Sequence, residues 1–468
     1  MATPTLDKDV SRQTSSLQYI PDASARTADA SPNQFLMPLN ASVSDRDTLV
    51  VGGCDVTELV EKFGSPLYIL DEQNLRKTCQ QYRDSFKDCY GGESQVIYAS
   101  KAWSCTAICA IAHSEGIGMD VVSGGELHTA LNAGVPASKI YLHGNNKSVE
   151  ELALAVDHGC TVIADNWFDL HNLVALKPAA PIRVMLRLTP GIECHTHEYI
   201  RTGHIDSKFG FDPTQVEEVF DYVTQQDCIS VIGLHAHIGS QIFETQPHND
   251  LGDVMVSWFK KALDRGLPVT ELNIGGGLGI RYTEQDDPPS IRQWIEIVSQ
   301  GVSAACEKYG VAPPKLIAEP GRSLVGSSCI TAYRVGSQKT VPGIRHYVSV
   351  DGGMSDNPRP ITYQSLYRSV VANRMSAPFT ETVTVAGKHC ESGDVVIPDA
   401  TLPALETDDV LVVLATGAYN ASMASNYNRV PRPAAVLVNN GEANVILKRE
   451  TNADLLRGDC LPTRLQQR

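Results

Sequence analysis

Short apolar runs alternate with amphipathic stretches through the middle of this chain. The amphipathic stretches, such as 102–116, 124–134 and 148–159, carry apolar residues at helical spacing. Strands that alternate with helices indicate parallel βαβ units, and eight such units predict a (β/α)8 barrel. The predicted barrel strands lie at 95–100, 116–122, 139–144, 161–165, 182–188, 231–238, 271–276 and 315–320.

The flanking regions follow other patterns. Residues 1–45 are rich in Ser, Asp, Ala, Thr and Pro with weak periodicity, which predicts a flexible N-terminal extension. Strand-like runs in 46–70 lead into the barrel, which we place at 71–323. In 324–468 helical spacing fades and strand-like runs with turn residues between them take over. The predicted fold class is therefore α/β plus β, with a mainly β C-terminal domain that residues 46–70 join.

Composition and charge restrict the class of protein. Hydrophobic residues make up 42% and charged residues 20% of the chain, as in ordinary globular proteins. The sequence has no apolar run of membrane-spanning length and no secretory signal pattern, which predicts a cytoplasmic protein without a membrane partner. A formal net charge of −15 repels phosphate backbones, so we expect no nucleic-acid partner. Twelve scattered cysteines without a CxxC pair indicate reduced thiols.

Polar residues gather at the ends of the predicted strands, and in barrels of this kind the active site forms at the carboxyl ends. The long connection 189–211 is either a functional loop or a lid or interface loop without chemistry. The strand ends supply a lysine, carboxylates, a histidine, glycine turns and an arginine. The candidates are Lys101, Asp120, Ser123–Glu126, His237, Gly239, Ser240, Gly275, Gly276, Gly277, Glu319, Gly321 and Arg322.

Two glycine-rich turns follow neighbouring predicted strands. GGGLG at 275–279 lets backbone N–H groups approach a phosphate, although by itself it is equally typical of a tight turn. EPGR at 319–322 adds a second turn on the next strand. Because barrels usually bind phosphate after strands seven and eight, the pair favours a phosphate site.

Lys101 and Glu319 suggest which phosphate compound binds there. A lysine at a strand end is either a solvated rim residue or a desolvated amine that attacks an aldehyde. A carboxylate that faces a pyridine nitrogen keeps it protonated, whereas otherwise Glu319 would cap a turn. His237 is either a stacking partner for a ring or a core histidine. Pyridoxal phosphate is the cofactor that gives all these residues a role.

Two HxH pairs leave a metal site as the alternative. His195 and His197, and His235 and His237, could share a zinc ion as in some barrel hydrolases. The first pair lies in the long connection rather than in a strand, and this interpretation leaves Lys101 without a role. We therefore predict no metal.

The C-terminal domain offers two further candidates. Cys390 stands beside Glu391 in HCESGDV and is either a proton donor or a buried thiol. Tyr419 in ATGAYNAS follows an apolar strand and is either a ligand contact or a packed tyrosine.

The motifs together resemble a known family. YASKA, DVVSGGE, HIGSQ, GGGLG, EPGR, NPRP, CESGD and GAY occur in this order between about Leu49 and Pro433. They are similar to the fold-type III pyridoxal-phosphate decarboxylases, which have an alanine-racemase-like fold, and among these to the diaminopimelate decarboxylases. Ornithine and arginine decarboxylases are similar in the barrel but typically lack the glutamate of CESGD.

The resemblance implies a role for each matching residue. Lys101 would hold the cofactor as a Schiff base, His237 would stack on its ring, and Glu319 would pair with its nitrogen. Cys390 would be the proton donor, and because the family takes this residue and Glu391 from the neighbouring subunit, a homodimer with shared active sites is implied. The other cofactor-binding residues would be Asp120, Ser240, Gly276, Gly277, Gly321, Arg322 and Tyr419, and the substrate-binding residues would be Arg322, Arg359, Tyr363, Glu391 and Tyr419.

The implied reaction is decarboxylation of meso-2,6-diaminopimelate to L-lysine and CO2, the last step of lysine biosynthesis. Ornithine lacks the second carboxylate, so it would leave the two arginines at the far end of the substrate unpaired. The alternatives are a related decarboxylase acting on another diamino or carrier-bound amino acid, the zinc hydrolase, and a non-catalytic regulator with the same fold. Intact Lys101 and Cys390 argue against the regulator.

Overall fold

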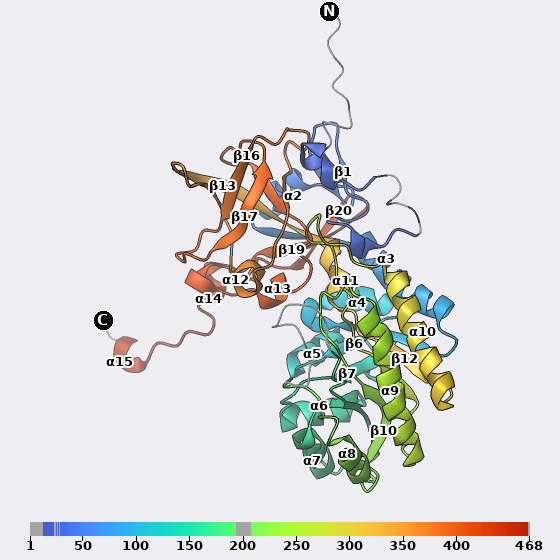
Figure 1. The fold of residues 1–468 in the computed structure, drawn as a ribbon. Helices are drawn as coiled ribbons and strands as arrows, with labels where there is room; N and C mark the ends of the chain where they lie inside the picture. The colour runs from blue at the N-terminus through green and yellow to red at the C-terminus, as the bar shows by residue number, and fades with distance from the viewer. Residues whose placement is uncertain (1–12, 23–24, 26, 28, 193–206, 467–468) are drawn as a thin grey trace, which may run out of the picture. The chain divides into compact units, whose positions relative to one another are not determined.

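A computed structural model describes residues 13–22, 25, 27, 29–192 and 207–466. The chain divides into two compact units, shown as ribbons in Figure 1. The barrel unit comprises 73–327 and the described residues of 23–35. The β unit comprises the described residues of 13–22, 36–72 and 328–466. None of the described helices combines the length and the apolar character needed to cross a bilayer.

The barrel unit confirms the predicted eight strands. Each strand pairs in parallel with the next, and β12 pairs with β5 to close the barrel. Ile97, Tyr141, Ile163, Met185 and Ile317 form a buried cluster within the strands. The strands are β5 (Ser94–Ala99), β6 (Gly118–Val121), β7 (Ile140–Leu142), β8 (Thr161–Ala164), β9 (Ile182–Arg187), β10 (Ile229–His235), β11 (Glu271–Asn273) and β12 (Lys315–Ala318).

Helices follow the barrel strands, and their ends match local sequence signals. Ser148 and Ser290 each begin a helix with a capping box, in which Glu151 or Gln293 returns the hydrogen bond. The helices are α3 (Glu72–Cys89), α4 (Thr106–Ser114), α5 (Gly124–Asn132), α6 (Val149–His158), α7 (Trp167–Ala175), α8 (Val216–Val223), α9 (Gln246–Asp264), α10 (Ile291–Tyr309) and α11 (Arg322–Val325).

The β unit is a mainly antiparallel sheet around the long strand β13. β4 (Leu67–Asp71) precedes the barrel in sequence but pairs with β13 and, in parallel, with β19. The remaining strands of this sheet are β13 (Cys329–Val341), β14 (Arg345–Val350), β15 (Ser369–Val371), β16 (Glu381–Ala386), β17 (Val395–Leu402), β18 (Val410–Val413), β19 (Ala434–Asn439) and β20 (Glu442–Leu447).

A smaller sheet and short helices complete the β unit. Apolar side chains of the small sheet, of α2 and of the main sheet share one core, which includes Val51, Leu59, Ile69 and Val412. The small sheet consists of β1 (Ser42–Val43), β2 (Leu49–Val51) and β3 (Cys54–Asp55), and the helices are α2 (Val56–Phe63), α12 (Arg359–Tyr363), α13 (Asn420–Met423), α14 (Asn452–Leu455) and α15 (Thr463–Gln466).

The described part of 1–45 makes specific contacts that its composition did not indicate. In the β unit, Val371 N–H donates to the Ser16 hydroxyl at 3.4 Å. In the barrel unit, the Asn33 side chain donates to the carbonyls of Gly279 at 3.2 Å and Pro289 at 2.9 Å. Ser16 and Asn33 are both buried. Polar side chains that pair with backbone groups leave no hydrophobic pattern, which is why composition predicted a flexible extension.

His248 of α9 is a buried histidine that packs edge-on against Trp294 of α10, with ring centroids 5.4 Å apart. It is 3% exposed, and neither ring nitrogen has a hydrogen-bond partner among the described residues. Burial lowers the pKa of His248 to about 3. The folded chain therefore keeps this ring neutral at a pH where the unfolded chain protonates it.

Replacing His248 should reduce the acid sensitivity of folding. As the pH falls below the unfolded pKa of about 6.5, the unfolded state binds one more proton here than the folded state, which costs up to about 1.4 kcal/mol of stability per pH unit. We expect His248→Leu to flatten this slope in urea unfolding between about pH 7 and 4. His128→Leu, at an exposed position, serves as the control. An unchanged slope in His248→Leu would contradict the prediction.

Candidate active site

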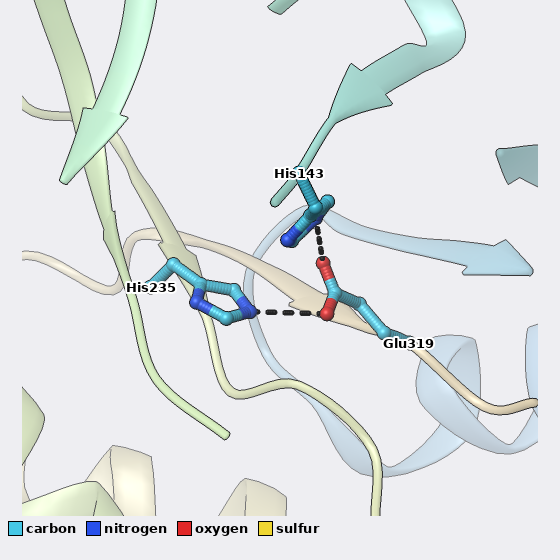
Figure 2. A group of neighbouring side chains, drawn as sticks. All are labelled: His143, His235 and Glu319. Carbon is cyan, nitrogen blue, oxygen red and sulfur yellow. Dashed lines mark hydrogen bonds and ion pairs between the residues drawn. The ribbon is translucent and has the colours of Figure 1, made fainter. Parts of the chain in front are cut away.

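Glu319 follows β12 and is a buried carboxylate with three side-chain nitrogen atoms around it. Its Oε1 accepts a hydrogen bond from Asn273 Nδ2 at 2.6 Å and lies 2.9 Å from His143 Nε2. Its Oε2 lies 3.0 Å from His235 Nε2. Figure 2 shows the two imidazoles reaching the two oxygens from different strands. The carboxyl ends of β10, β11 and β12 and the residue after β7 thus converge on one side chain.

These partners decide the charge of Glu319. Burial by itself raises the pKa of Glu319, but His143 and then His235 outweigh it and hold the pKa well below its usual range. Burial lowers the pKa of His235 to about 4 in spite of Glu319, so this ring is neutral near neutral pH. The site therefore contains an ionised carboxylate.

Asp120 is a second buried carboxylate of the same site. It belongs to β6 and is 2% exposed. Burial raises the pKa of Asp120 to about 6, against the opposing effect of His143. Its Oδ1 lies 3.7 Å from His143 Nε2 and has no hydrogen-bond partner among the described residues. A buried polar atom of this kind suits a site that binds a polar ligand.

At the two glycine turns, the backbone of one turn lies close to the backbone of the other. A Cβ on Gly276 would lie 2.4 Å from the carbonyl oxygen of Glu319, so no side chain fits there. Gly277 has φ +128°, which other residues rarely adopt. The N–H of Gly276 donates to His237 Nδ1 at 3.2 Å, which fixes the ring next to this turn.

Arg322 joins the second glycine turn to the loop after β10. Its guanidinium donates to the Ser240 hydroxyl from Nε at 3.2 Å and from Nη2 at 3.1 Å. Its Nη1 donates to the Tyr282 hydroxyl at 2.8 Å. Arg322 is 4% exposed, so its charge is held in the site rather than in solvent. Ser240, Gly321 and Arg322 are thereby gathered as predicted.

Lys101 lies in η4 (Ser100–Ala102), the turn that follows β5, and its side chain is exposed. Of the two alternatives left by the sequence, the chain by itself shows the solvated lysine at the barrel rim. A position at the end of a strand predicts a desolvated amine, but Lys101 lies in the η4 turn, beyond the end of β5. Its charge still acts on the site, because after burial it is the main cause that lowers the pKa of His237.

In the β unit, two of the predicted substrate-binding residues, Tyr363 and Tyr419, lie beside a third, Arg359 of α12. The centre of its guanidinium lies 5.6 Å from the ring centroids of both Tyr363 and Tyr419. Its Nε donates to the Tyr367 hydroxyl at 2.9 Å, and its Nη2 donates to Ser365 at 3.0 Å. Arg359 is 7% exposed, and its guanidinium lies beside two aromatic rings.

Cys390 and Glu391 lie on an exposed turn of the β unit. The turn is anchored by Asp394, which is buried and accepts hydrogen bonds from Met354 N–H at 2.7 Å and His389 N–H at 2.9 Å. The buried-thiol alternative for Cys390 is therefore wrong for the chain by itself. An exposed thiol beside an exposed carboxylate remains available to a ligand or a second subunit.

Of the two histidine pairs that left a metal site as the alternative, His195 and His197 lie outside the described residues. In the other pair, His235 ends β10 and His237 lies two residues beyond it, and the two rings have different partners, Glu319 for His235 and the Gly276 N–H for His237. The described residues do bring His143, His235 and Glu319 together, with ligand atoms within 4.8 Å of one another.

Sequence reasoning overlooked His143, Asn273 and Tyr282. His143 follows β7 and Asn273 ends β11, so the strand-end rule that found Lys101 and Glu319 applied to both. Tyr282 had no such signal, because it lies in a loop and is recognised only by its contact with Arg322.

Fold and site together define a barrel enzyme of the pyridoxal-binding class. Residues 72–326 match the family described as "Pyridoxal-dependent decarboxylase, pyridoxal binding domain". The chain is 64% identical to the diaminopimelate decarboxylase of Synechocystis sp., over 94% of this chain and 96% of that one. It is 47% identical to the Bacillus subtilis enzyme of the same name, over 88% and 95%.

Solved structures agree with the sequence comparison. The fold superposes on diaminopimelate decarboxylase from M. jannaschii in complex with L-lysine with a TM-score of 0.83 and 32% identity, over 91% of this chain and 98% of that one. The chain belongs to the pyridoxal-dependent decarboxylases, in the diaminopimelate decarboxylase family.

The residues present fit pyridoxal 5'-phosphate, the cofactor of this family. A Cβ does not fit in the Gly276 turn, and side-chain-free turns of this kind are used in phosphate cradles. Glu319 is an ionised carboxylate suited to a pyridine nitrogen, and Lys101 offers an accessible amine. The buried Oδ1 of Asp120 supplies a further acceptor for the ligand.

Adding one methyl group to the Gly276 turn should impair cofactor binding. The new Cβ of Gly276→Ala would meet the Glu319 carbonyl, so the two turns must separate. We expect the dissociation constant of pyridoxal phosphate to rise by about 10-fold or more in a titration of the apoenzyme. Gly91→Ala, where a Cβ would meet no atom within 4 Å beyond its chain neighbours, should bind normally. Equal affinities in both variants would contradict the assignment.

Proposed function

We propose that this chain decarboxylates meso-2,6-diaminopimelate to L-lysine and CO2, the last step of lysine biosynthesis. The observation that carries the proposal is the ionised carboxylate of Glu319, set beside two glycine turns in a chain 64% identical to a diaminopimelate decarboxylase. The M. jannaschii relative was solved with L-lysine, which is the product of the proposed reaction.

When bound, pyridoxal phosphate supplies a ring that accepts the electron pair left when CO2 departs. Lys101 is the proposed residue for covalent attachment of the cofactor. Glu319 would provide the negative charge that keeps a proton on the ring nitrogen. His237, whose Nδ1 accepts a hydrogen bond from the Gly276 N–H, would lie against the ring, and the turns at Gly277 and Gly321 with Ser240 would hold the phosphate. Asp120 would complete the cofactor site.

Recognition of the distal end of the substrate requires fixed charges. We assign Arg322, Arg359 and Tyr363 to its carboxylate and Glu391 to its amino group, with Tyr419 touching cofactor and substrate. Tyr367 and Ser365 orient the Arg359 guanidinium before any ligand arrives, which limits the entropy lost on binding. Ornithine lacks the carboxylate that these cations bind.

Cys390 is the proposed donor of the proton that replaces the departing carboxylate. Its exposure with Glu391 on the turn supports a working enzyme that is a homodimer, in which this turn serves the neighbouring subunit. We also propose a cytoplasmic location, which the free thiols of the described cysteines support.

Loss of the Lys101 amine should remove both colour and activity. Purified wild-type enzyme should show the visible absorbance of a lysine-bound pyridoxal and release CO2 from meso-diaminopimelate at least about 1000-fold faster than from ornithine. Lys101→Ala should be colourless and about 1000-fold slower or worse. Lys87→Ala, at an exposed helix position, is the control. A coloured, active Lys101→Ala, or equal rates on ornithine, would refute the proposal.

Shared active sites can be tested by mixing inactive subunits. Lys101→Ala and Cys390→Ala homodimers should each be inactive. In a heterodimer of the two, one site receives both an intact lysine and an intact cysteine. Random reassociation should therefore restore roughly a quarter of wild-type activity. No recovery, in a mixture that mass spectrometry shows to contain heterodimers, would mean that each subunit uses its own Cys390.

A further inference from the structure

We infer that His143 and His235 are positioning residues that hold Glu319 as a carboxylate and leave its Oε2 to receive the ring N–H of the cofactor. The inference rests on the proposed function, because it assigns Glu319 to the ring nitrogen. It adds two residues whose contact is with Glu319 rather than with substrate.

The two carboxylate oxygens of Glu319 differ in how many nitrogen atoms lie close to them. Oε1 accepts a hydrogen bond from Asn273 at 2.6 Å, and His143 Nε2 also lies 2.9 Å from it, so two side chains already crowd this oxygen. Oε2 has His235 at 3.0 Å and room for one more donor. A protonated pyridine nitrogen is a donor of the right kind for that remaining position. The arrangement therefore selects one oxygen and one direction of approach.

The two rings also fix each other. His143 and His235 meet edge to face, with centroids 4.9 Å apart and planes at 73°. They are 4% and 1% exposed, so neither can turn toward solvent. Since β7 and β10 carry them from different parts of the barrel, the carboxylate between them is oriented by the strands themselves.

Asp120 provides an internal comparison. It is 2% exposed, against 7% for Glu319, and its Oδ1 has no described hydrogen-bond partner. Burial raises its pKa to about 6, whereas the pKa of Glu319 is depressed. One site thus holds two carboxylates, and the nitrogen atoms around Glu319 lower its pKa relative to that of Asp120. Without its histidines, Glu319 would resemble Asp120, and its charge would be lost as the pH falls through about 6.

The experiment compares loss of the donor with retention of it. His143→Leu and His235→Leu remove the N–H, whereas His143→Gln and His235→Gln keep an N–H near the position of Nε2. His128→Leu is the surface control. The readouts are the dissociation constant of pyridoxal phosphate, the pH dependence of the bound-cofactor absorbance, and kcat separately from KM for meso-diaminopimelate.

We expect the Leu variants to bind cofactor at least about 10-fold more weakly, because each loses an imidazole nitrogen close to a charged group. Their absorbance should become pH-dependent near neutrality, and kcat should fall while KM changes little. The Gln variants should stay within about 3-fold of wild type. Leu variants that match wild type, or Gln variants as impaired as the Leu variants, would overturn the inference.

The pH comparison must account for the other ionisable groups around the cluster. Asp120, Lys101, Arg187, Tyr141 and His237 are coupled by charge to Glu319 or to Asp120. They are present in every variant, so only the difference between Leu and Gln variants reports on the two histidines.

A second measurement covers the case in which the Leu variants do not fold. Infrared spectra of wild-type apoenzyme, minus those of Glu319→Gln, isolate the Glu319 side chain. Carboxylate bands that persist at pH 5 support the inference, and a protonated acid band at pH 5 overturns it. This readout needs no substrate, so it is independent of the proposed reaction. If wild-type enzyme binds cofactor but does not decarboxylate meso-diaminopimelate, the proposed function fails while this result stands.

Discussion

Closure of the barrel around a buried negative charge is the constraint on which the site depends. Burying a carboxylate costs several kcal/mol unless donors replace its water. For Glu319 these donors come from the ends of β10 and β11 and from the residue after β7, which lies far along the barrel from β12. An open sheet could not bring them to one side chain. The same fold that buries the charge therefore also brings in the polar side chains that offset the free-energy cost of burying it.

At this end of the barrel, the neighbours of each polar group determine how readily that group is charged. Glu319 is ionised, and Asp120 has a pKa raised to about 6 by burial. His237 is kept neutral by burial and by the charge of Lys101, and Gly276 holds its ring in place. A neutral ring, an anion and an accessible amine are the combination that a pyridoxal cofactor requires.

In the β unit, a buried residue anchors a turn on which the candidate functional residues are exposed. Asp394 accepts hydrogen bonds from two backbone segments, and a Cβ on Gly353 or Gly387 would lie 2.4 Å or closer to its carboxylate. Asp394, the last residue of the CESGD motif, is therefore structural. Cys390 and Glu391, its first two residues, extend from that anchored turn and are exposed. One short motif thus combines a residue that anchors the turn with the two residues proposed to act on the substrate.

The sequence by itself determined the eight barrel strands, the glycine turns and the candidacy of Lys101 and Glu319, because strand periodicity and strand ends are local properties. It also pointed to the family, through motifs kept in order. Only the tertiary structure decided that His143 and Asn273 belong to Glu319, that Lys101 stands in the turn beyond its strand, and that Ser16 and Asn33 are buried. These depend on which distant strands become neighbours when the barrel closes, and no local pattern records that.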